Sequence, residues 1–502
     1  MRPFVRILRA AWIIGCLAAG LPAGSVGAQQ IGDRSTTGTF GGAILLTPAG
    51  SHYRDATRLG RLIPEVPRLP FAEIIIQVRA FGEAYYESAL APKAFGVSEG
   101  FDPLGEFLKG LATAPDPPRV IAWLDLLAVA NVNRPVPLAA AHVLSEHGDW
   151  LTLNVRSERV DAEGFQCLEP ALAEVQAHLE QIVSELIAQY PIDGVLLDGL
   201  RYPGVAAEWG YHPGVLQAWR ERTGRTDRPA PDDASWIEFR REGLNRLVER
   251  LVAASRNARP GVSVSVMGLS EGPAPTEPGG FAESLVAAGA LQDWRAWIGQ
   301  SQLDRVIVEN FRAEGDVAER EAFDAWNHLA ARIGRQTGAE VFAAVAGFRN
   351  ISFDALMQMR RAREAGLAGA ALAYYHAPIQ DLGTRDPFFG ALRATVLAPS
   401  AERLSTTQTA AAPSPEPPSP PVLELPPPPE PPVPPAVETA RGEMVPETTT
   451  PTTDTLAVAP PPGIEELLRA STRGLEGTRG RRLLQPSEAA LEYLRRKFPN
   501  LF

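Results

Sequence analysis

The sequence predicts a (β/α)8 barrel of the TIM type between residues 38 and 395. Eight short apolar runs follow one another along this stretch, and helical patterns with one apolar face separate them. The runs cover residues 40–46, 73–78, 119–124, 193–197, 262–267, 304–308, 341–345 and 369–375. Because the runs are nearly continuous in hydrophobicity, they indicate parallel strands that are covered by helices. Eight such units fit a barrel enlarged by insertions, and a doubly wound open sheet is the structural alternative.

Two of the separating segments show the helical pattern most clearly. Apolar residues recur at spacings of three and four over residues 171–190, and again in a segment that begins at Ser235. This spacing places the apolar residues on one face of a helix, which can then pack on the sheet. The opposite face carries the polar residues expected of an outer layer.

Residues 1–28 have the pattern of a secretory signal peptide. A basic start, an apolar stretch from Ala10 to Leu21 and small residues up to Ala28 follow one another in the required order. The predicted location is therefore secreted or periplasmic. Cys16 lies in a short sequence similar to a lipobox, so lipid attachment at this cysteine is the alternative.

Residues 396–463 are predicted to be a disordered linker rich in proline and threonine. Of the 47 prolines in the chain, 19 lie between Pro413 and Pro462. This composition favours extended polyproline conformations over a packed core. Residues 464–502 are predicted to be a short C-terminal segment, in which Ser487 is placed to begin a helix.

The composition argues against several classes of function. The formal net charge of −11 argues against a nucleic-acid partner, because phosphate binding needs a basic surface. Removal of Cys16 with a signal peptide leaves Cys167 as the single cysteine, and no Cys/His spacing resembles a zinc site. We therefore expect no metal and no organic cofactor. The sequence makes no prediction of the oligomeric state.

The segment YPIDGVLLDGLRYPG, residues 190–204, places two aspartates in one apolar run. In a barrel of this type the active site lies at the C-terminal ends of the strands, where the following loops meet. Asp198 ends the fourth predicted strand and is therefore predicted to lie at that face. Asp193 starts the same strand at the opposite face, and we assign it a structural role.

This segment resembles the DG-I-H-x-D-x-x-R-Y-P signature of the glycosyl-hydrolase-like 10 family of bacterial cell-envelope proteins. Other segments resemble further motifs of that family in the same order: IIIQVRAFGEAYYES, GFDPLGEFL, ARPGVSVSVM, LQDWRAWIGQSQLDRVIVENF and GFRN. The resemblance spans about residues 38–380. It implies a TIM-type barrel and a glycosidase that acts on envelope polysaccharide, with denuded peptidoglycan glycan as the leading substrate. Independently of the resemblance, the segment from Gly463 carries eight Arg and Lys against five Glu, and we expect the Pro-rich tail to be a contact for envelope components.

The chain departs from the family pattern at two strand ends. Ile121 stands where the family commonly has the histidine of an H-A-W motif, which removes an imidazole able to contact a sugar. The sixth strand ends in VIVENF in place of a Pro-Met-x-Tyr run, so Glu309 and Phe311 occupy those positions. A non-catalytic glycan-binding or envelope-organising protein on the same barrel is therefore the alternative function.

Glycoside cleavage usually needs two carboxyl groups, one on each side of the bond. Carboxylates at or just after predicted strand ends are Glu83, Asp125, Asp198, Glu271 and Glu309. We predict Asp198 as the nucleophile or base, because Arg201 could hold it ionised. We predict Glu309 as the acid, because the apolar strand before it favours a raised pKa. The alternative is that Asp198 only anchors its loop through an ion pair with Arg201 or Arg79.

Aromatic and polar residues at other strand ends suit a sugar site. Trp123, Tyr202 and Tyr374 are predicted to stack on sugar rings, and Arg79, Arg201 and Asn310 to complete the substrate-binding set. Residues 268–272, GLSEG, match the G-x-S-x-G motif of serine esterases. That motif requires a helix directly after the serine, whereas a loop rich in proline and glycine follows here. A carboxylate mechanism is therefore favoured over a serine nucleophile.

Overall fold

A computed structural model of the protein describes residues 40–48, 53–133, 136–300, 303–350, 352–373 and 387–397. Eight parallel strands form a closed barrel in this part of the chain. They are β1 (Gly41–Leu46), β2 (Glu73–Ala80), β4 (Arg119–Asp125), β7 (Gly194–Asp198), β8 (Ser263–Leu269), β9 (Arg305–Glu309), β10 (Glu340–Ala346) and β11 (Gly369–Ala373). Each strand pairs with the next, and β1 pairs with both β2 and β11, which closes the sheet. The predicted barrel and its eight strands are confirmed, and the open-sheet alternative is wrong.

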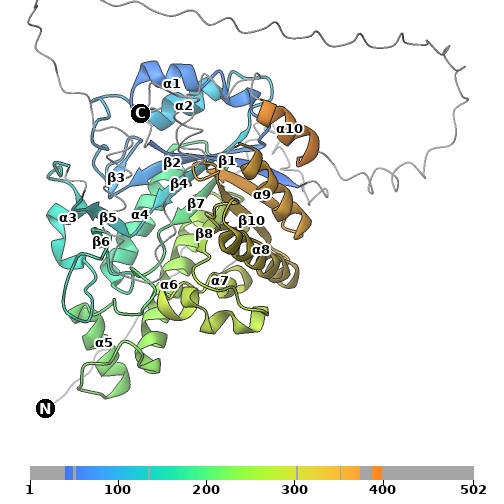
Figure 1. Ribbon diagram of the computed structural model, residues 1–502. Helices are drawn as coiled ribbons and strands as arrows, with labels where there is room; N and C mark the ends of the chain where they lie inside the picture. The colour runs from blue at the N-terminus through green and yellow to red at the C-terminus, as the bar shows by residue number, and fades with distance from the viewer. Residues whose placement is uncertain are drawn as a thin grey trace, which may run out of the picture. The chain divides into compact units, whose positions relative to one another are not determined.

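Helices surround the sheet, as Figure 1 shows. The longer ones are α1 (Ala56–Leu62), α2 (Pro103–Leu111), α4 (Ala173–Gln189), α5 (Pro213–Thr223), α6 (Ala234–Ala258), α7 (Trp294–Gln300), α8 (Val317–Thr337), α9 (Ser352–Glu364) and α10 (Pro387–Thr395). Short helical turns are α3 (Val143–Glu146), η2 (Val66–Arg68), η3 (Gly148–Trp150), η4 (Pro278–Glu283) and η5 (Leu285–Gly289). The two helices predicted from spacing are α4 and α6, and their apolar faces are buried.

Local sequence explains where the two longest helices begin and end. Asp233 and Asp316 precede α6 and α8, and each side chain accepts hydrogen bonds from two backbone N–H groups of the first turn. These bonds satisfy donors that have no partner within the helix. Gly338 ends α8 with a positive φ of 72°, a conformation that costs glycine little.

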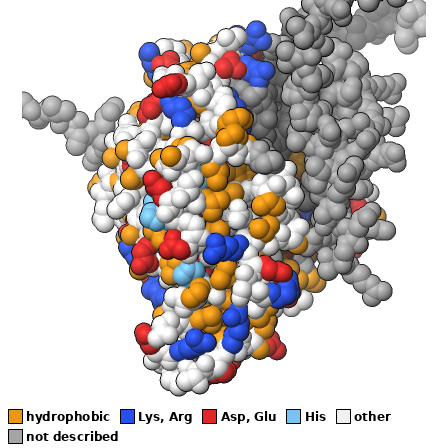
Figure 2. Space-filling view, turned by 90° about the vertical axis from the view of Figure 1, so that its left-hand side faces the viewer, with side chains coloured by type: hydrophobic (Ala, Val, Ile, Leu, Met, Phe, Trp, Pro, Cys, Tyr) orange, Lys and Arg blue, Asp and Glu red, His pale blue; other side chains and the backbone are white. Residues whose placement is uncertain are grey.

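A small two-stranded sheet follows the C-terminal end of β4. Strand β5 (Ala128–Asn131) follows β4 after two residues and pairs antiparallel with β6 (Phe165–Cys167), while β3 (Glu83–Ala84) pairs antiparallel with β2. Figure 2 views the side of the molecule that carries β3, β5 and β6, where hydrophobic side chains form a band with charged residues of both signs beside it. This small sheet therefore continues the chain beyond the C-terminal end of β4.

The predicted signal peptide, residues 398–463 of the predicted linker and the predicted C-terminal segment lie outside the described residues. Within the described residues, no helix combines the length and hydrophobicity needed to span a membrane.

The inward-facing side chains of the strands form layers along the barrel axis. The middle of the barrel is apolar, and its side chains are Ala43, Leu45, Ile75, Ile121, Trp123, Leu196, Met267, Ile307, Phe342, Ala344, Ala371 and Ala373. Residues two positions apart on a strand face the same side of the sheet. The same alternation therefore turns Asp125, Asp198 and Glu309 toward the axis at the C-terminal ends of their strands.

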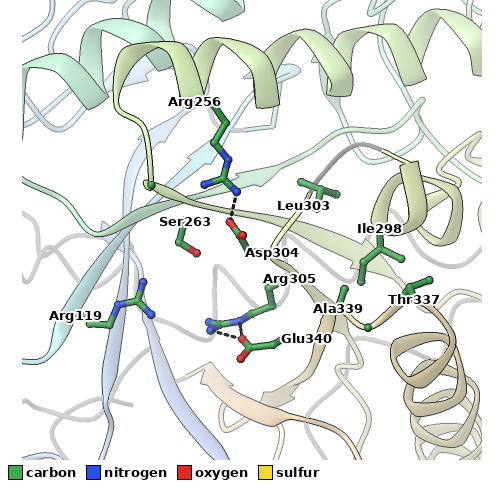
Figure 3. A pocket seen from close by; sticks show the side chains of 12 residues that line it. Arg119, Arg256, Ser263, Ile298, Leu303, Asp304, Arg305, Thr337, Ala339 and Glu340 are labelled. Carbon is green, nitrogen blue, oxygen red and sulfur yellow. Dashed lines mark hydrogen bonds and ion pairs between the residues drawn. The ribbon is translucent and has the colours of Figure 1, made fainter. Parts of the chain in front are cut away.

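Paired charges close the N-terminal end of the barrel. Arg305 forms ion pairs with Glu73 and with Glu340, the latter at 2.8 Å, and Arg119 lies 2.6 Å from Glu73. A depression of about 470 Å³ opens at this end, and Arg119, Arg305 and Glu340 line it (Figure 3). Each arginine has a carboxylate partner, which is the arrangement that a buried charge requires.

Asp193 also lies at the N-terminal end, as predicted. Its Oδ2 accepts a hydrogen bond of 2.8 Å from the backbone N–H of Val120, at the start of the neighbouring strand β4. Asp304 makes the equivalent contact with Val264 at the start of β8, at 2.7 Å. An aspartate just before a strand thus satisfies the first free donor of the strand beside it.

The ring of Phe342 fills the axis above the charged layer. The Arg305 guanidinium carbon lies 4.0 Å from the centre of this ring. Gly41 and Gly369 border the ring so closely that a Cβ atom at either position would overlap it. The two glycines therefore leave the space that Phe342 occupies.

We predict that Gly369→Ala destabilises the barrel by about 1–3 kcal/mol, because the added methyl group overpacks a site bounded by Phe342 and the carbonyl oxygen of Gly41. The matched control is Gly60→Ala in α1, where an added Cβ meets no atom within 4 Å. Urea unfolding of the three proteins measures the difference. Equal midpoints for the two variants would show that the barrel axis tolerates the extra volume.

Candidate active site

Three carboxyl groups lie together at the C-terminal mouth of the barrel. Asp125 ends β4 and Asp198 ends β7, and the two residues are direct partners in the register of these neighbouring strands. Glu309 ends β9, two strands from β7 in the sheet, which corresponds to two spacings of about 4.8 Å. Asp198 and Glu309, which the sequence predicts as the catalytic pair, are therefore both placed at the mouth, with Asp125 beside them.

Hydrogen bonds hold the Asp198 carboxylate in one orientation. The indole N–H of Trp123 donates to Oδ2 at 2.9 Å, and the backbone N–H of Gly199 donates to Oδ1 at 2.6 Å. Trp123 is only 7% exposed, and its ring packs with the apolar residues inside the barrel. The structure thus gives Trp123 a positioning contact with Asp198. Its predicted stacking on a sugar stays a prediction.

Glu309 lies in an environment that favours its protonated form. Its side chain is 30% exposed, and its Oε2 lies 3.8 Å from Nη1 of Arg201. Burial raises the pKa of Glu309 to about 7, Arg201 acts against this rise, and the charges of Asp198, Glu271 and Asp125 add to it. Glu309 can therefore carry a proton near neutral pH and release it to an acceptor in the mouth. Arg201 makes its ion pair with Glu309, and the nearby charge of Asp198 also acts on its guanidinium.

Asp125 is the carboxyl group that the sequence prediction left without a role. Burial raises its pKa to about 7, the charge of Asp198 raises it further, and Arg79 and Arg201 act against this rise. The strand-end position marks Asp125 as a candidate in the sequence. Its pairing with Asp198 becomes visible only through the register of β4 and β7.

Arg79 supports the mouth from beneath. Its side chain is fully buried, and Nη1 donates to the carbonyl oxygens of Asp125 and Leu126, the latter at 3.1 Å. The guanidinium therefore fixes the end of β4. The sequence predicts that Arg79 contacts the substrate. In the structure its side chain is buried beneath the mouth and binds backbone carbonyl groups.

Two other residues predicted to contact the substrate have buried side chains. Tyr202 is 1% exposed, and its hydroxyl donates to Oε1 of the buried Glu169 at 2.5 Å. Asn310 is fully buried, and its Nδ2 donates to Phe323 O at 3.0 Å and to Asn327 Oδ1 at 3.1 Å. Both side chains point into packing layers and away from the mouth. Tyr374 lies outside the described residues.

The serine of the GLSEG segment does not form a nucleophile site. Ser270 is 4% exposed, and its hydroxyl donates to the carbonyl oxygen of Glu309 at 2.7 Å. Asp304 and His376 follow this serine in the order Ser, Asp, His that the triad of an α/β-hydrolase has. Asp304 lies at the other end of the barrel, where it binds Val264 and Arg256. His376 lies outside the described residues. Ser270 thus links the end of β8 to the end of β9 through this hydrogen bond.

In the part of the chain that the structure describes, no three side chains among histidine, cysteine, aspartate and glutamate are grouped to hold a metal ion. The chemistry that the mouth offers is that of carboxyl groups. One carboxylate is held by two donors, and two carboxyl groups can keep a proton near neutral pH. A pair of carboxyl groups in different environments can act as proton donor and as nucleophile or base.

Comparison with known proteins finds a matching family, similar sequences and a solved structure with a similar fold. The family described as "Glycosyl hydrolase-like 10" matches residues 39–340. The "Glycosyl hydrolase DigH" of Escherichia coli strain K12 is 24% identical over 263 residues, which are 49% of this chain and 56% of DigH. The "Glycosyl hydrolase YngK" of Bacillus subtilis strain 168 is 24% identical over 270 residues, which are 51% of this chain and 49% of YngK. The chain thus spans about half the length of these curated relatives.

A solved structure has a similar fold. The PgaB (BpsB) glycoside hydrolase domain from Bordetella bronchiseptica matches with a TM-score of 0.51 and 14% sequence identity. The match covers 72% of this chain and 100% of that domain. At this identity the similarity concerns the fold alone.

The raised pKa of Glu309 predicts how stability depends on pH. The folded protein keeps this proton up to about pH 7, whereas the unfolded chain loses it near the ordinary glutamate pKa of about 4.3. The folded state therefore loses stability relative to the unfolded chain as pH rises through this window. Glu309→Gln removes the ionisation and should stabilise the protein at pH 8 by an amount on the order of 1–2 kcal/mol, after allowance for solvent screening and for the lost contact with Arg201.

Unfolding by urea at pH 5 and pH 8 measures this effect. The gain from Glu309→Gln should be much smaller at pH 5, where the wild-type side chain is already protonated in the folded protein. An equal gain at both pH values would contradict a raised pKa.

Tyr202→Phe should cost about 1.5–3 kcal/mol of folding stability, because the buried Glu169 carboxylate loses a hydrogen-bond donor. Tyr211→Phe is the matched control, since its buried hydroxyl donates to a neutral backbone carbonyl, that of Pro229, at 3.1 Å. The expected cost of that variant is about 0.5–1.5 kcal/mol. Thermal unfolding of both variants compares the two values, and equal losses would speak against a charged acceptor at Glu169.

Proposed function

The chain belongs to the glycosyl hydrolase-like 10 family, and we propose that it hydrolyses glycosidic bonds in a cell-wall or extracellular polysaccharide. The favoured substrate is the glycan strand of peptidoglycan. The observation that carries the proposal is the pair of carboxyl groups at the mouth, Asp198 held by two donors and Glu309 with a pKa raised to about 7. No metal or organic cofactor enters the proposed reaction.

The two carboxyl groups have different roles in the proposed reaction. Glu309 donates its proton to the glycosidic oxygen as the bond to the leaving sugar breaks. Asp198 acts on the other side of the sugar ring, either by attacking the anomeric carbon or by activating a water molecule. After the proton transfer, the guanidinium of Arg201, 3.8 Å away, stabilises the new charge on Glu309.

The surroundings of the site fit this division of roles. Trp123 and Gly199 keep the Asp198 carboxylate turned toward the mouth, and Arg79 fixes the end of the neighbouring strand from below. A reacting group must be held in place before the reaction for its full effect on the rate. The proposed location is secreted or periplasmic, with the Pro-rich tail as a contact for envelope components.

Variants at the two proposed catalytic residues test the function. Purified protein is incubated with peptidoglycan sacculi and with a panel of other polysaccharides, and released sugars and new reducing ends are measured. Asp198→Asn and Glu309→Gln should each lower the turnover by about 10²–10⁴-fold, because each removes one carboxyl group from the pair. Glu271→Gln, which changes a carboxylate of the same mouth, should stay within a few-fold of the wild type.

Two results would overturn this assignment. Loss of turnover in Glu271→Gln together with normal turnover in Glu309→Gln would make Glu271 the acid. No release from any polysaccharide by the wild type, combined with retention of the protein on sacculi, would support the alternative of a glycan-binding or envelope-organising protein.

A further inference from the structure

We propose that Asp125 is a positioning residue of the mouth, which forms a proton-sharing pair with its register partner Asp198 and whose charge acts on Glu309. The catalytic consequence rests on the proposed function. The proton sharing itself does not depend on that function and can be measured separately.

The geometry brings Asp125 and Asp198 to the same glycine. The two aspartates are register partners on neighbouring strands. Gly199 donates its N–H to Oδ1 of Asp198 at 2.6 Å, and a Cβ atom on Gly199 would overlap Oδ1 of Asp125. The φ of Gly199 is +71°, a conformation that also favours glycine. Both carboxyl groups therefore lie against the same residue.

The two carboxyl groups differ in their hydrogen-bond donors. Both oxygens of Asp198 accept a hydrogen bond, whereas Asp125 accepts one from the backbone of Ala128 and its buried Oδ1 has no protein donor. An adjacent pair of carboxyl groups avoids a double negative charge by keeping one proton. Burial and the lack of a donor at Oδ1 favour the protonated form of Asp125, so the proton of the pair belongs on this residue.

Charged and titratable groups face Asp125 from each element packed around it. Arg79 from β2 and Arg201 from the loop after β7 oppose protonation, while Asp198 from β7 favours it. Glu309 from β9 and Cys167 from β6 respond to the charge of Asp125 in turn. Burial raises the pKa of the Cys167 thiol far above neutral, so this group stays uncharged while Asp125 titrates. Burial together with the neighbouring Asp198 outweighs the two arginines and raises the pKa of Asp125 to about 7.

The titration of Asp125 affects the acid of the proposed reaction. When pH rises through neutrality, Asp125 loses its proton and places a new negative charge in the mouth. This charge is one of the causes that raise the pKa of Glu309. Ionised Asp125 therefore helps Glu309 to keep its proton at a pH where an isolated glutamate would have lost it. Below neutrality Asp125 is neutral and has no such effect.

The variant Asp125→Asn keeps the shape of the side chain and removes its charge. In the pH profile of kcat/KM, we expect the alkaline limb to move to lower pH by roughly 0.3–1 unit, because Glu309 loses the support of a neighbouring charge. The acid limb should stay in place. An alkaline limb that does not move, or a loss of activity at every pH, would overturn the proposal.

Carbon-13 NMR of the aspartate carboxyl groups tests the shared proton without any substrate. In the full-length wild type, one aspartate resonance should titrate near pH 7, and it should be absent from Asp125→Asn. In Asp198→Asn the same resonance should titrate at lower pH, because the neighbouring charge is gone. This second variant tests the pair even if Asp125→Asn fails to fold.

Asp161→Asn provides the control. Asp161 is a partly buried aspartate in the loop before β6, and its carboxylate accepts backbone hydrogen bonds from Glu163 and Phe165. The resonance assigned to Asp125 should persist in that variant. Its persistence in Asp125→Asn would instead overturn the proposal. If the wild type cleaves no polysaccharide, the proposed function fails, while the NMR titration still decides whether the pair exists.

Discussion

The closure of the sheet is the constraint on which the rest of the structure depends. Because β1 pairs with both β2 and β11, all eight strands run parallel around one axis, and their C-terminal ends meet at one mouth. The register then decides which side chains lie next to one another there. A slip of one residue between β4 and β7 would turn Asp125 or Asp198 out of the barrel. The chemistry of the mouth is thus a consequence of backbone pairing.

The two ends of the barrel use charged residues in opposite ways. At the N-terminal end, Glu73, Arg119, Arg305 and Glu340 neutralise one another, which is the usual condition for burying charge. At the mouth, burial raises the pKa values of Asp125 and Glu309, and the charges of neighbouring carboxyl groups raise them further. Such an arrangement costs folding stability and provides groups that can exchange protons near neutral pH. The N-terminal end therefore contributes stability, whereas the mouth carries the groups that can exchange protons.

Sequence reasoning predicted the strands well and some of the side chains poorly, and the difference has a physical basis. An apolar run of five to seven residues between turn signals favours a buried strand, and all eight runs correspond to strands of the barrel. Tyr202 and Asn310 follow strands too, but a residue just beyond a strand can turn toward the mouth or into the helix layer. Both side chains are buried outside the mouth, because Glu169 and Asn327 offer them buried hydrogen-bond partners. Spacing along the sequence carries no information about such partners.

The sequence by itself determined the barrel, the number and order of its strands, and the presence of Asp198 and Glu309 at strand ends, because these follow from periodicity and from the position of a residue in its own strand. Only the tertiary structure decided which carboxyl groups interact. It placed Arg201 on Glu309, Trp123 on Asp198, and Asp125 beside Asp198, through the register of neighbouring strands and the course of the loops. The physical reason is that a pKa depends on the charges and the burial around a group, and these come from residues far away in the chain.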